Sequence, residues 1–294
     1  MRISLTGANG FLGTYVGSKL IADGHHVIAW IRDTAKSAYQ DARFFDLGKA
    51  REIDLQDTDI LVHCAAYLPP SFADDPNERK KCAIYNGLAT YQLLEEAELA
   101  NIKTFIYISS GQIYEPKLEK AKEDDNIYTD YRAKPYLRSK ELGERNVMFH
   151  NKYSKMRIII LRPSSIYGNR MKDSGLLPRL IRRINAEEKF EIEEIGNYYV
   201  DLVCVEDVAN MISIAVNNAA VSGVYNVGGG QPILTSHLVD TLCCLLNRPL
   251  PWGNPKKFEI EKGHAPLNID KARNIGYKPI TLIKGIMSYT KAIK

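Results

Sequence analysis

The sequence predicts an α/β protein with a doubly wound parallel sheet and a smaller, interleaved C-terminal domain, and three observations carry this prediction. A glycine-rich turn near the N-terminus joins a short apolar strand to a helix. Short apolar runs then alternate with helical stretches as far as Pro163, and glycine and proline become frequent after Tyr167. Strands that alternate with helices are typical of a parallel sheet covered by helices on both faces.

The glycine-rich turn follows a short buried strand, Arg2–Leu5, and leads into a helix that begins near Phe11. Gly7 allows a turn with positive φ, Gly10 removes the Cβ that would block a diphosphate, and Gly13 lets the helix approach the strand. The N-terminus of the helix offers free N–H groups and the positive end of its dipole to an anion. This order of strand, turn and helix predicts a Rossmann-type dinucleotide-binding site.

A second predicted strand, His26–Ile31, ends where such a fold selects its cofactor. An acidic residue there selects the free ribose 2′-hydroxyl of NAD, and an arginine accommodates the 2′-phosphate of NADP. The sequence continues with Arg32 and Asp33. Because the guanidinium of Arg32 is suited to a phosphate or to stacking on adenine, we expect NADP(H) to be favoured over NAD(H). The alternative is a solvated Arg32 paired with Asp33.

Further apolar runs complete the predicted sheet and divide the chain. They predict strands at 43–47, 60–66, 104–110, 157–163, 201–205 and 223–227, and helical spacing predicts a helix at 79–100. The last two strands could return to the main sheet. We therefore expect a dinucleotide-binding domain over 1–167, with returning segments near 197–230, and a substrate-binding domain formed by 168–196 and 231–294.

The composition is that of an ordinary globular protein of 294 residues, with 45% hydrophobic residues and a net charge of +4. Basic and acidic residues are interspersed, which gives little support to nucleic-acid or membrane binding. The 5 cysteines are odd in number and lack the paired spacing of a metal site, so we expect neither disulfides nor a bound metal. The N-terminus enters a strand directly, and no apolar run reaches membrane-spanning length. We expect a cytoplasmic protein.

Tyr136 and Lys140 are the first catalytic candidates, because residues four apart share one face of a helix. Pro135 stands at a plausible first-turn position of that helix. The ordinary pKa of tyrosine, about 10, is high for a base at neutral pH, and an adjacent ammonium lowers it. Hydride transfer at a carbon that bears oxygen needs such a proton carrier and a second hydrogen-bond donor. Ser110, at the C-terminal end of a buried predicted strand, is the candidate for that donor.

Together these motifs resemble those of extended short-chain dehydrogenase/reductases of the NAD(P)-dependent epimerase/dehydratase family, nearly from end to end of the chain. The resemblance is carried by Thr6–Gly13, His63–Ala66, Asn86, Ser109–Tyr114, Tyr136, Lys140, Leu161–Pro163, Tyr167–Gly168 and Tyr225–Gly228. Members of this family mostly oxidise, reduce, epimerise or dehydrate nucleotide-activated sugars. The sugar lies between the nicotinamide and the C-terminal domain.

The resemblance implies roles for individual residues. Ser110, Tyr136 and Lys140 would be catalytic, with Tyr136 as the acid/base and Lys140 binding the nicotinamide ribose while lowering the pKa of Tyr136. Asp46 would meet the adenine amine, and Ala65–Ala66 would line the pyrophosphate and the nicotinamide ribose. The expected cofactor site comprises Gly7, Asn9, Gly10, Phe11, Leu12, Gly13, Arg32, Asp46, Leu47, Ala65, Ala66, Asn86, Lys140, Arg162 and Pro163.

Two departures from the family pattern bear on the substrate. Sugar dehydratases of the family carry an Asp-Glu pair directly after the catalytic hydroxyl, where this chain has Gly111 and Gln112, so we do not expect dehydration. Sugar-nucleotide enzymes also tend to carry arginines that grip the substrate diphosphate, at the positions of Val200 and, approximately, His264. The substrate-binding residues that we expect instead are Tyr167, Arg170, Arg179 and Lys262.

The leading hypothesis is an NADP-favouring enzyme that reduces the 4-keto group of a nucleotide-activated sugar. Arg32 supports reduction, since epimerases retain a bound NAD. The alternatives are a nucleotide-sugar 4-epimerase, a carbonyl reductase for a non-nucleotide substrate, which Val200 prompts, and a non-catalytic NADP-binding sensor, against which the intact Ser/Tyr/Lys set argues. The helical stretches Leu238–Leu246 and Ile283–Tyr289 could form the interface of a homodimer.

Overall fold

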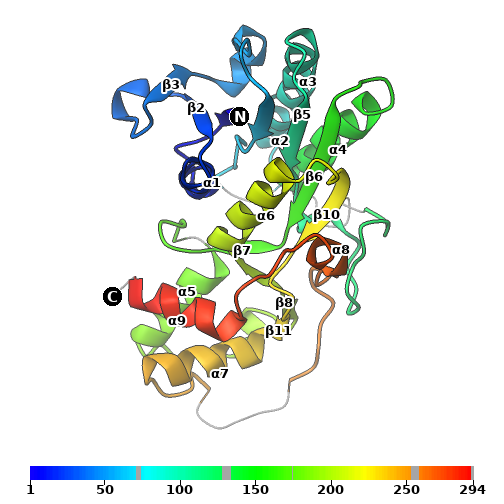
Figure 1. The fold of residues 1–294 in the computed structure, drawn as a ribbon. Coiled ribbons are helices and arrows are strands. Elements are labelled where there is room, and N and C mark those ends of the chain that lie inside the picture. The colour runs from blue at the N-terminus through cyan, green and yellow to red at the C-terminus, as the bar shows by residue number, and fades with distance from the viewer. Residues whose placement is uncertain (71–73, 128–133, 174, 253–257, 293–294) are drawn as a thin grey trace.

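The fold is built on a parallel sheet, and the computed structural model describes residues 1–70, 74–127, 134–173, 175–252 and 258–292. Within these residues the main sheet has seven strands in the order β10-β6-β5-β4-β1-β2-β3, with all neighbours parallel (Figure 1). The strands are β1 (Arg2–Thr6), β2 (His26–Ile31), β3 (Asp41–Phe44), β4 (Ile60–His63), β5 (Thr104–Ile108), β6 (Arg157–Pro163) and β10 (Gly223–Val227). The strand order reverses at β1, because β2 and β4 lie on its two sides, and ligands of such sheets bind outside the carboxyl ends of the strands at this point.

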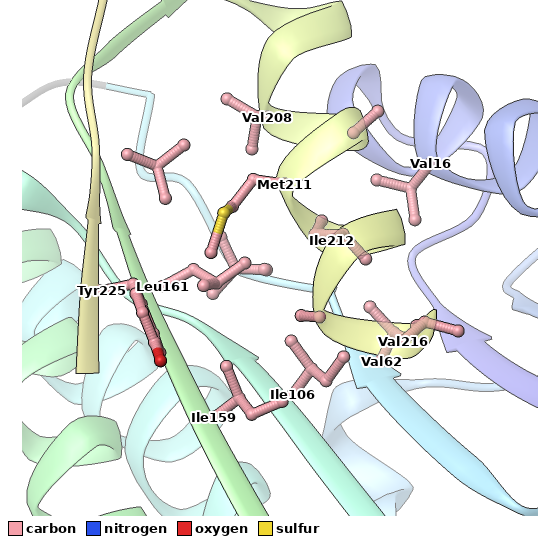
Figure 2. Close-up of a cluster of buried hydrophobic side chains, with 14 of the residues drawn as sticks. Val16, Val62, Ile106, Ile159, Leu161, Val208, Met211, Ile212, Val216 and Tyr225 are labelled. Atoms are coloured by element: carbon pink, nitrogen blue, oxygen red, sulfur yellow. The ribbon is translucent and has the colours of Figure 1, made fainter. Parts of the chain in front are cut away.

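Helices cover both faces of this sheet, because its strands are apolar on both sides. The first face carries α1 (Phe11–Ala22) and α6 (Val205–Asn217), and the second carries α2 (Pro76–Cys82), η3 (Ala83–Leu88), α3 (Ala89–Leu99) and α4 (Pro135–His150). Figure 2 shows how α6 packs on the first face, where Met211 and Ile212 belong to the same buried cluster as Ile106 and Ile159 of the sheet. All four side chains are fully buried.

Most of the remaining elements form a smaller C-terminal lobe beyond the carboxyl ends of the main strands (Figure 1). Its helices α5 (Leu176–Asn185), α7 (Thr235–Leu246) and α9 (Leu282–Ala292) share an apolar core with Leu180, Leu238 and Ile286 at its centre. The lobe also contains β7 (Ser165–Tyr167), η6 (Ile192–Glu194), β8 (Tyr199–Val200), β9 (Leu202–Cys204) and β11 (Ile233–Leu234). The short helix α8 (Asp270–Arg273) instead lies against β10, and its Ala272 belongs to the core on the first face of the main sheet. Short 3-10 turns in the sheet domain are η1 (Thr34–Lys36), η2 (Leu47–Glu52) and η4 (Gly111–Ile113).

The structure confirms one of the two strands expected to return to the main sheet and corrects the other. Gly223–Val227 pairs with β6 at the sheet edge, as predicted. The segment 201–205 does not return, because β10 already occupies that edge, and its residues 202–204 pair with β7 in a separate two-stranded sheet. This segment instead forms part of the boundary between the main sheet and the lobe.

Several predicted boundaries also shift. The strands expected to reach residues 66 and 110 end at His63 and Ile108. Two other shifts have a local reason. The strand expected to reach residue 47 ends at Phe44, because Asp46 caps the turn η2 by accepting a hydrogen bond from the Gly48 N–H at 2.7 Å. The helix expected from residue 79 begins at Pro76, because the carboxylate of Asp75 accepts hydrogen bonds from the next free N–H groups. Within the described residues no helix is long and apolar enough to cross a bilayer.

Candidate active site

A cleft of about 1380 Å³ runs along the carboxyl ends of the main strands, from the glycine turn to the C-terminal lobe. Most of the predicted site residues line it. On one side, which we call the sheet wall, lie Gly7, Asn9, Gly10, Phe11, Leu12, Gly13, Arg32, Asp46, Leu47, Ala65, Ala66, Ser110, Tyr136, Lys140 and Pro163. On the opposite side, which we call the lobe wall, lie Tyr167, Lys172, Arg179, Val200 and His264.

The glycine turn fits a dinucleotide because side chains are missing where backbones approach closely. Gly7 has φ of +71°, and a Cβ on it would lie 2.8 Å from the Cα of Ala65. A Cβ on Gly13 would lie 2.1 Å from the carbonyl oxygen of Gly7, so glycine lets α1 begin directly against β1. The helix starts at Phe11, and its first N–H groups lie at the cleft. The turn can therefore hold a diphosphate.

The loop after β2 is docked onto the glycine turn. Tyr39 donates a hydrogen bond to the carbonyl oxygen of Ala8 at 3.3 Å, and its hydroxyl occupies the space that a Cβ on Gly17 would fill. Arg32, in the same loop, is exposed and lines the cleft. Asp46 lines the cleft after β3, the neighbour of β2. The structure thus brings the two predicted adenosine-side residues to adjacent strand ends.

The three catalytic candidates meet in the cleft from two elements. Ser110 follows β5, and its Oγ accepts a hydrogen bond from the Gln112 N–H at 3.1 Å, which leaves the hydroxyl hydrogen for a ligand. Tyr136 lies in the first turn of α4, behind Pro135 at the helix start. Lys140 lies one turn further along, where it is 3% exposed and lines the cleft.

Burial decides the protonation of the Tyr136 and Lys140 pair. The pKa of Tyr136 is raised to about 12 by desolvation, and the Cys82 thiol adds to the rise. The pKa of Lys140 is lowered to about 8 by desolvation, although Cys64 and Glu144 both favour its charged form. The structure thus shows a net rise in the pKa of Tyr136 rather than the expected lowering, because desolvation is the largest cause of the shift. At neutral pH Tyr136 is a phenol.

Asn86 lies outside the cleft, contrary to its predicted place in the cofactor site. Its side-chain amide donates to Ser139 Oγ at 2.9 Å and to the carbonyl oxygen of Tyr67 at 2.9 Å, and it accepts from the Tyr67 N–H at 2.7 Å. Ser139 in turn donates to the carbonyl oxygen of Tyr136 at 2.7 Å. Asn86 belongs to the π-helical turn η3, a feature that often marks functional sites. It fastens the first turn of α4 to the loop after β4.

Arg162, also predicted to bind cofactor, is held in a buried ion pair with Glu144 and does not line the cleft. Its Nε donates to Glu144 Oε1 at 3.1 Å, and its Nη1 donates to Tyr114 Oη at 2.5 Å. Ser109 donates to Glu144 Oε2 at 2.5 Å, and Tyr114 donates to Asn226 Oδ1 at 2.7 Å. This network ties α4 to β5, β6 and β10 behind the catalytic residues.

The structure separates the cations that were expected to bind substrate. Arg179, on α5, is exposed and lines the lobe wall. Arg170 and Lys262 are exposed, but neither lines the cleft. Lys172, which sequence reasoning passed over, does line it. Only its place in the folded lobe distinguishes Lys172 from other surface lysines, so no local signal could have found it.

Comparison with known proteins decides the family. The model of the NAD dependent epimerase/dehydratase family matches residues 3–228. The chain belongs to this family. It is 26% identical to a putative UDP-glucose 4-epimerase of Methanocaldococcus jannaschii, over 97% of this chain and 95% of that protein. It is 24% identical to a dTDP-4-dehydro-6-deoxy-D-allose reductase of Streptomyces bikiniensis, over 84% of this chain and 82% of that protein.

A solved structure of similar fold is the UDP-glucuronic acid 4-epimerase from Bacillus cereus, in complex with UDP-glucuronic acid and NAD. It superposes with a TM-score of 0.80 and 22% identity, over 100% of this chain and 99% of that chain. As an NAD(P)-dependent member of the epimerase/dehydratase family, this enzyme has the expected fold and cofactor class. Because the solved epimerase holds NAD, the expected preference for NADP stays a prediction.

Two further residues of this epimerase/dehydratase enzyme escaped the sequence analysis. Glu144 follows Lys140 by one helical turn, a spacing that ordinarily indicates a surface ion pair. Tyr107 lies in the continuous apolar run of β5, where a strand residue is expected to serve packing alone. A tyrosine in such a run is nevertheless a signal, because its buried hydroxyl requires a hydrogen-bond partner.

Proposed function

We propose that this enzyme reduces the 4-keto group of a nucleotide-activated sugar, with NADPH as its preferred hydride donor. The observation that supports this function is the cleft itself. Its sheet wall gathers the glycine turn with Ser110, Tyr136 and Lys140, and its lobe wall leaves room opposite them for a second ligand.

The chain's own residues supply the proton and position the oxygen. A bound nicotinamide cofactor supplies the hydride. Tyr136, a phenol at neutral pH, donates a proton to the oxygen that was the keto group. Ser110 donates a hydrogen bond to the same oxygen as its negative charge develops. Lys140 binds the cofactor ribose, and its ammonium stabilises the phenolate left on Tyr136.

The protonated phenol of Tyr136 is the form that reduction requires in its proton donor. Reduction requires a proton donor beside the reacting oxygen, whereas oxidation requires a proton acceptor there. A tyrosine whose pKa is raised to about 12 is overwhelmingly protonated at neutral pH. Arg32 supports the same direction, because its exposed guanidinium at the end of β2 suits the 2′-phosphate of NADPH.

The lobe wall supports a substrate that carries a diphosphate. Arg179 and Lys172 both line it, and two cations can offset the charge of a nucleotide sugar. Tyr167 lines the same wall, but its ring is 2% exposed and its hydroxyl lies where a Cβ on Gly285 would fall. We therefore propose that Tyr167 shapes the wall and that Arg179 and Lys172 bind the diphosphate.

A second candidate function is 4-epimerisation of a nucleotide sugar. The similarity to the putative UDP-glucose 4-epimerase, which extends over nearly the whole of both chains, favours it. The same three residues serve this reaction, since an epimerase oxidises its substrate and then reduces it from the other face. Epimerisation would use a retained NAD rather than an exchanging NADPH.

Turnover of a panel of 4-keto and 4-hydroxy nucleotide sugars separates these functions. Each compound is incubated with NADPH, with NADH and with neither, while cofactor oxidation and sugar products are followed. We expect a 4-keto nucleotide sugar to consume NADPH faster than NADH. Isomerisation without net cofactor oxidation would instead establish the epimerase. Turnover of uncharged ketones alone would establish a carbonyl reductase, and NADPH binding with no turnover of any compound would establish a sensor.

A further inference from the structure

Tyr107 of β5 touches Lys140 in two ways at once. The Lys140 Nζ lies 4.5 Å from the centroid of the Tyr107 ring, within the range of a cation–π contact. The Tyr107 hydroxyl donates to the carbonyl oxygen of Lys140 at 3.3 Å. Both residues are buried, with Tyr107 at 0% exposure. One side chain therefore contacts both the backbone and the ammonium of the same lysine.

Gly143 makes this double contact sterically feasible. A Cβ on Gly143 would lie 2.3 Å from the Tyr107 hydroxyl oxygen, closer than any side chain could tolerate. The glycine thus opens a notch in α4 into which the phenol fits. Because Gly143 stands three residues after Lys140, the notch sits directly beside the turn that carries the ammonium.

We propose that Tyr107 is a positioning residue for Lys140, holding the ammonium charged and aimed at the cofactor ribose through the face of its ring. This inference rests on the role that the proposed function gives to Lys140. An ammonium taken out of water needs a compensating contact, and the negative face of an aromatic ring provides one without an opposing charge. Tyr107 lies in β5 and Ser110 follows the same strand, so β5 would position both Lys140 and the Ser110 hydroxyl.

The other titratable groups around Lys140 do not replace Tyr107 as the contact that stabilises the ammonium. The titratable groups around it are His63 at the end of β4, Cys64 directly after it, Tyr107 on β5 and Glu144 on α4, with Tyr136 one turn earlier on α4. Burial keeps the first two neutral, with the pKa of His63 lowered to about 3 and that of Cys64 raised to about 12. The Glu144 carboxylate supports the ammonium electrostatically, but Arg162 already pairs with it.

The test follows NADPH binding across pH, because binding does not depend on knowing the substrate. Lys140 is charged below its pKa of about 8, so the affinity of the wild-type enzyme for NADPH should fall as pH rises through that value. Tyr107→Phe keeps the ring and should keep the midpoint. Replacing that Phe by its trifluorinated analogue keeps the shape but weakens the ring's negative face. The midpoint should then move down by on the order of one pH unit.

Matched variants separate this role from packing. Phe105, two residues earlier in β5, is also fully buried, and Phe105→Leu should lower stability without moving the midpoint. Tyr107→Leu should move it in the same direction as the fluorinated ring. If Tyr107→Leu fails to fold, the midpoints measured with Phe and with its trifluorinated analogue at position 107 still test the role of the ring.

The outcomes for the inference and for the proposed function differ. Lys140→Met should bind NADPH weakly and without the step near pH 8. If Lys140→Met binds as the wild type does, the assignment of Lys140 fails, and this inference with it. A second outcome is that the fall in NADPH affinity near pH 8 depends on Lys140 but has the same midpoint in every variant at position 107. In that case the proposed function stands and the role of Tyr107 is overturned.

Discussion

The two walls of the cleft hold their polar side chains in different ways. On the sheet wall, buried contacts from Asn86 and Glu144 fasten α4, which carries Tyr136 and Lys140. On the lobe wall, Arg179 stands exposed on α5. Long exposed side chains keep their conformational freedom, whereas buried hydrogen-bonded ones do not. We infer that the sheet wall is preorganised for the chemistry and that the lobe wall adapts to the substrate.

Tyr136→Phe is the substitution on the sheet wall with the largest expected effect. It removes one oxygen and keeps the ring, so packing and cofactor binding should survive while the proton donor is lost. Loss of general acid catalysis should lower the rate by about 10²–10⁴-fold. The measurement is single-turnover reduction, with circular dichroism as the control for folding. An unchanged rate in a folded variant would remove Tyr136 from the mechanism.

Glu144→Gln tests whether the sheet wall depends on its buried ion pair. It keeps the shape of the side chain but leaves Arg162 buried without a carboxylate, which should cost about 3–5 kcal/mol of unfolding free energy. The measurement is urea unfolding. The control is Glu95→Gln, which breaks an ion pair with Arg51, itself 54% exposed. That change should cost less than about 1 kcal/mol. Equal losses in the two variants would show that burial of the pair carries no special weight.

Arg32→Ala probes the end of the sheet wall that is exposed rather than buried. The loss of a charge-assisted contact should weaken NADPH binding by about 1.5–3 kcal/mol and leave NADH binding nearly unchanged. Titration with the two cofactors measures this difference. Equal affinities of the wild-type enzyme for NADPH and NADH would contradict the predicted preference for NADPH.

The smallest expected effect belongs to the lobe wall. Arg179→Ala should raise the KM for a nucleotide sugar by roughly fivefold, equivalent to about 1 kcal/mol, because an exposed cation contributes little alone. Arg170→Ala and Lys262→Ala are matched controls, since both cations are exposed but do not line the cleft. If a control raised KM as much as Arg179→Ala, the assignment of the lobe wall would be wrong.

The sequence by itself predicted the parallel sheet, the glycine turn and the catalytic candidates. Each of these depends on local chemistry. A positive φ at Gly7 is a property of one residue, and the shared face of Tyr136 and Lys140 follows from helical spacing alone. Ser110 was found because strand ends meet at one edge of a parallel sheet. None of these inferences needs a distance between segments remote in sequence.

Only the tertiary structure decided how these residues are supported and charged. Glu144 meets Arg162 from a different element, and Tyr107 reaches Lys140 from beneath the helix. Such pairings need the packing of α4 on the sheet. The pKa of Tyr136 likewise rises rather than falls, because desolvation depends on everything packed around the hydroxyl and not on its helical neighbour. Local spacing can place a charge beside a phenol, but burial determines which effect is larger.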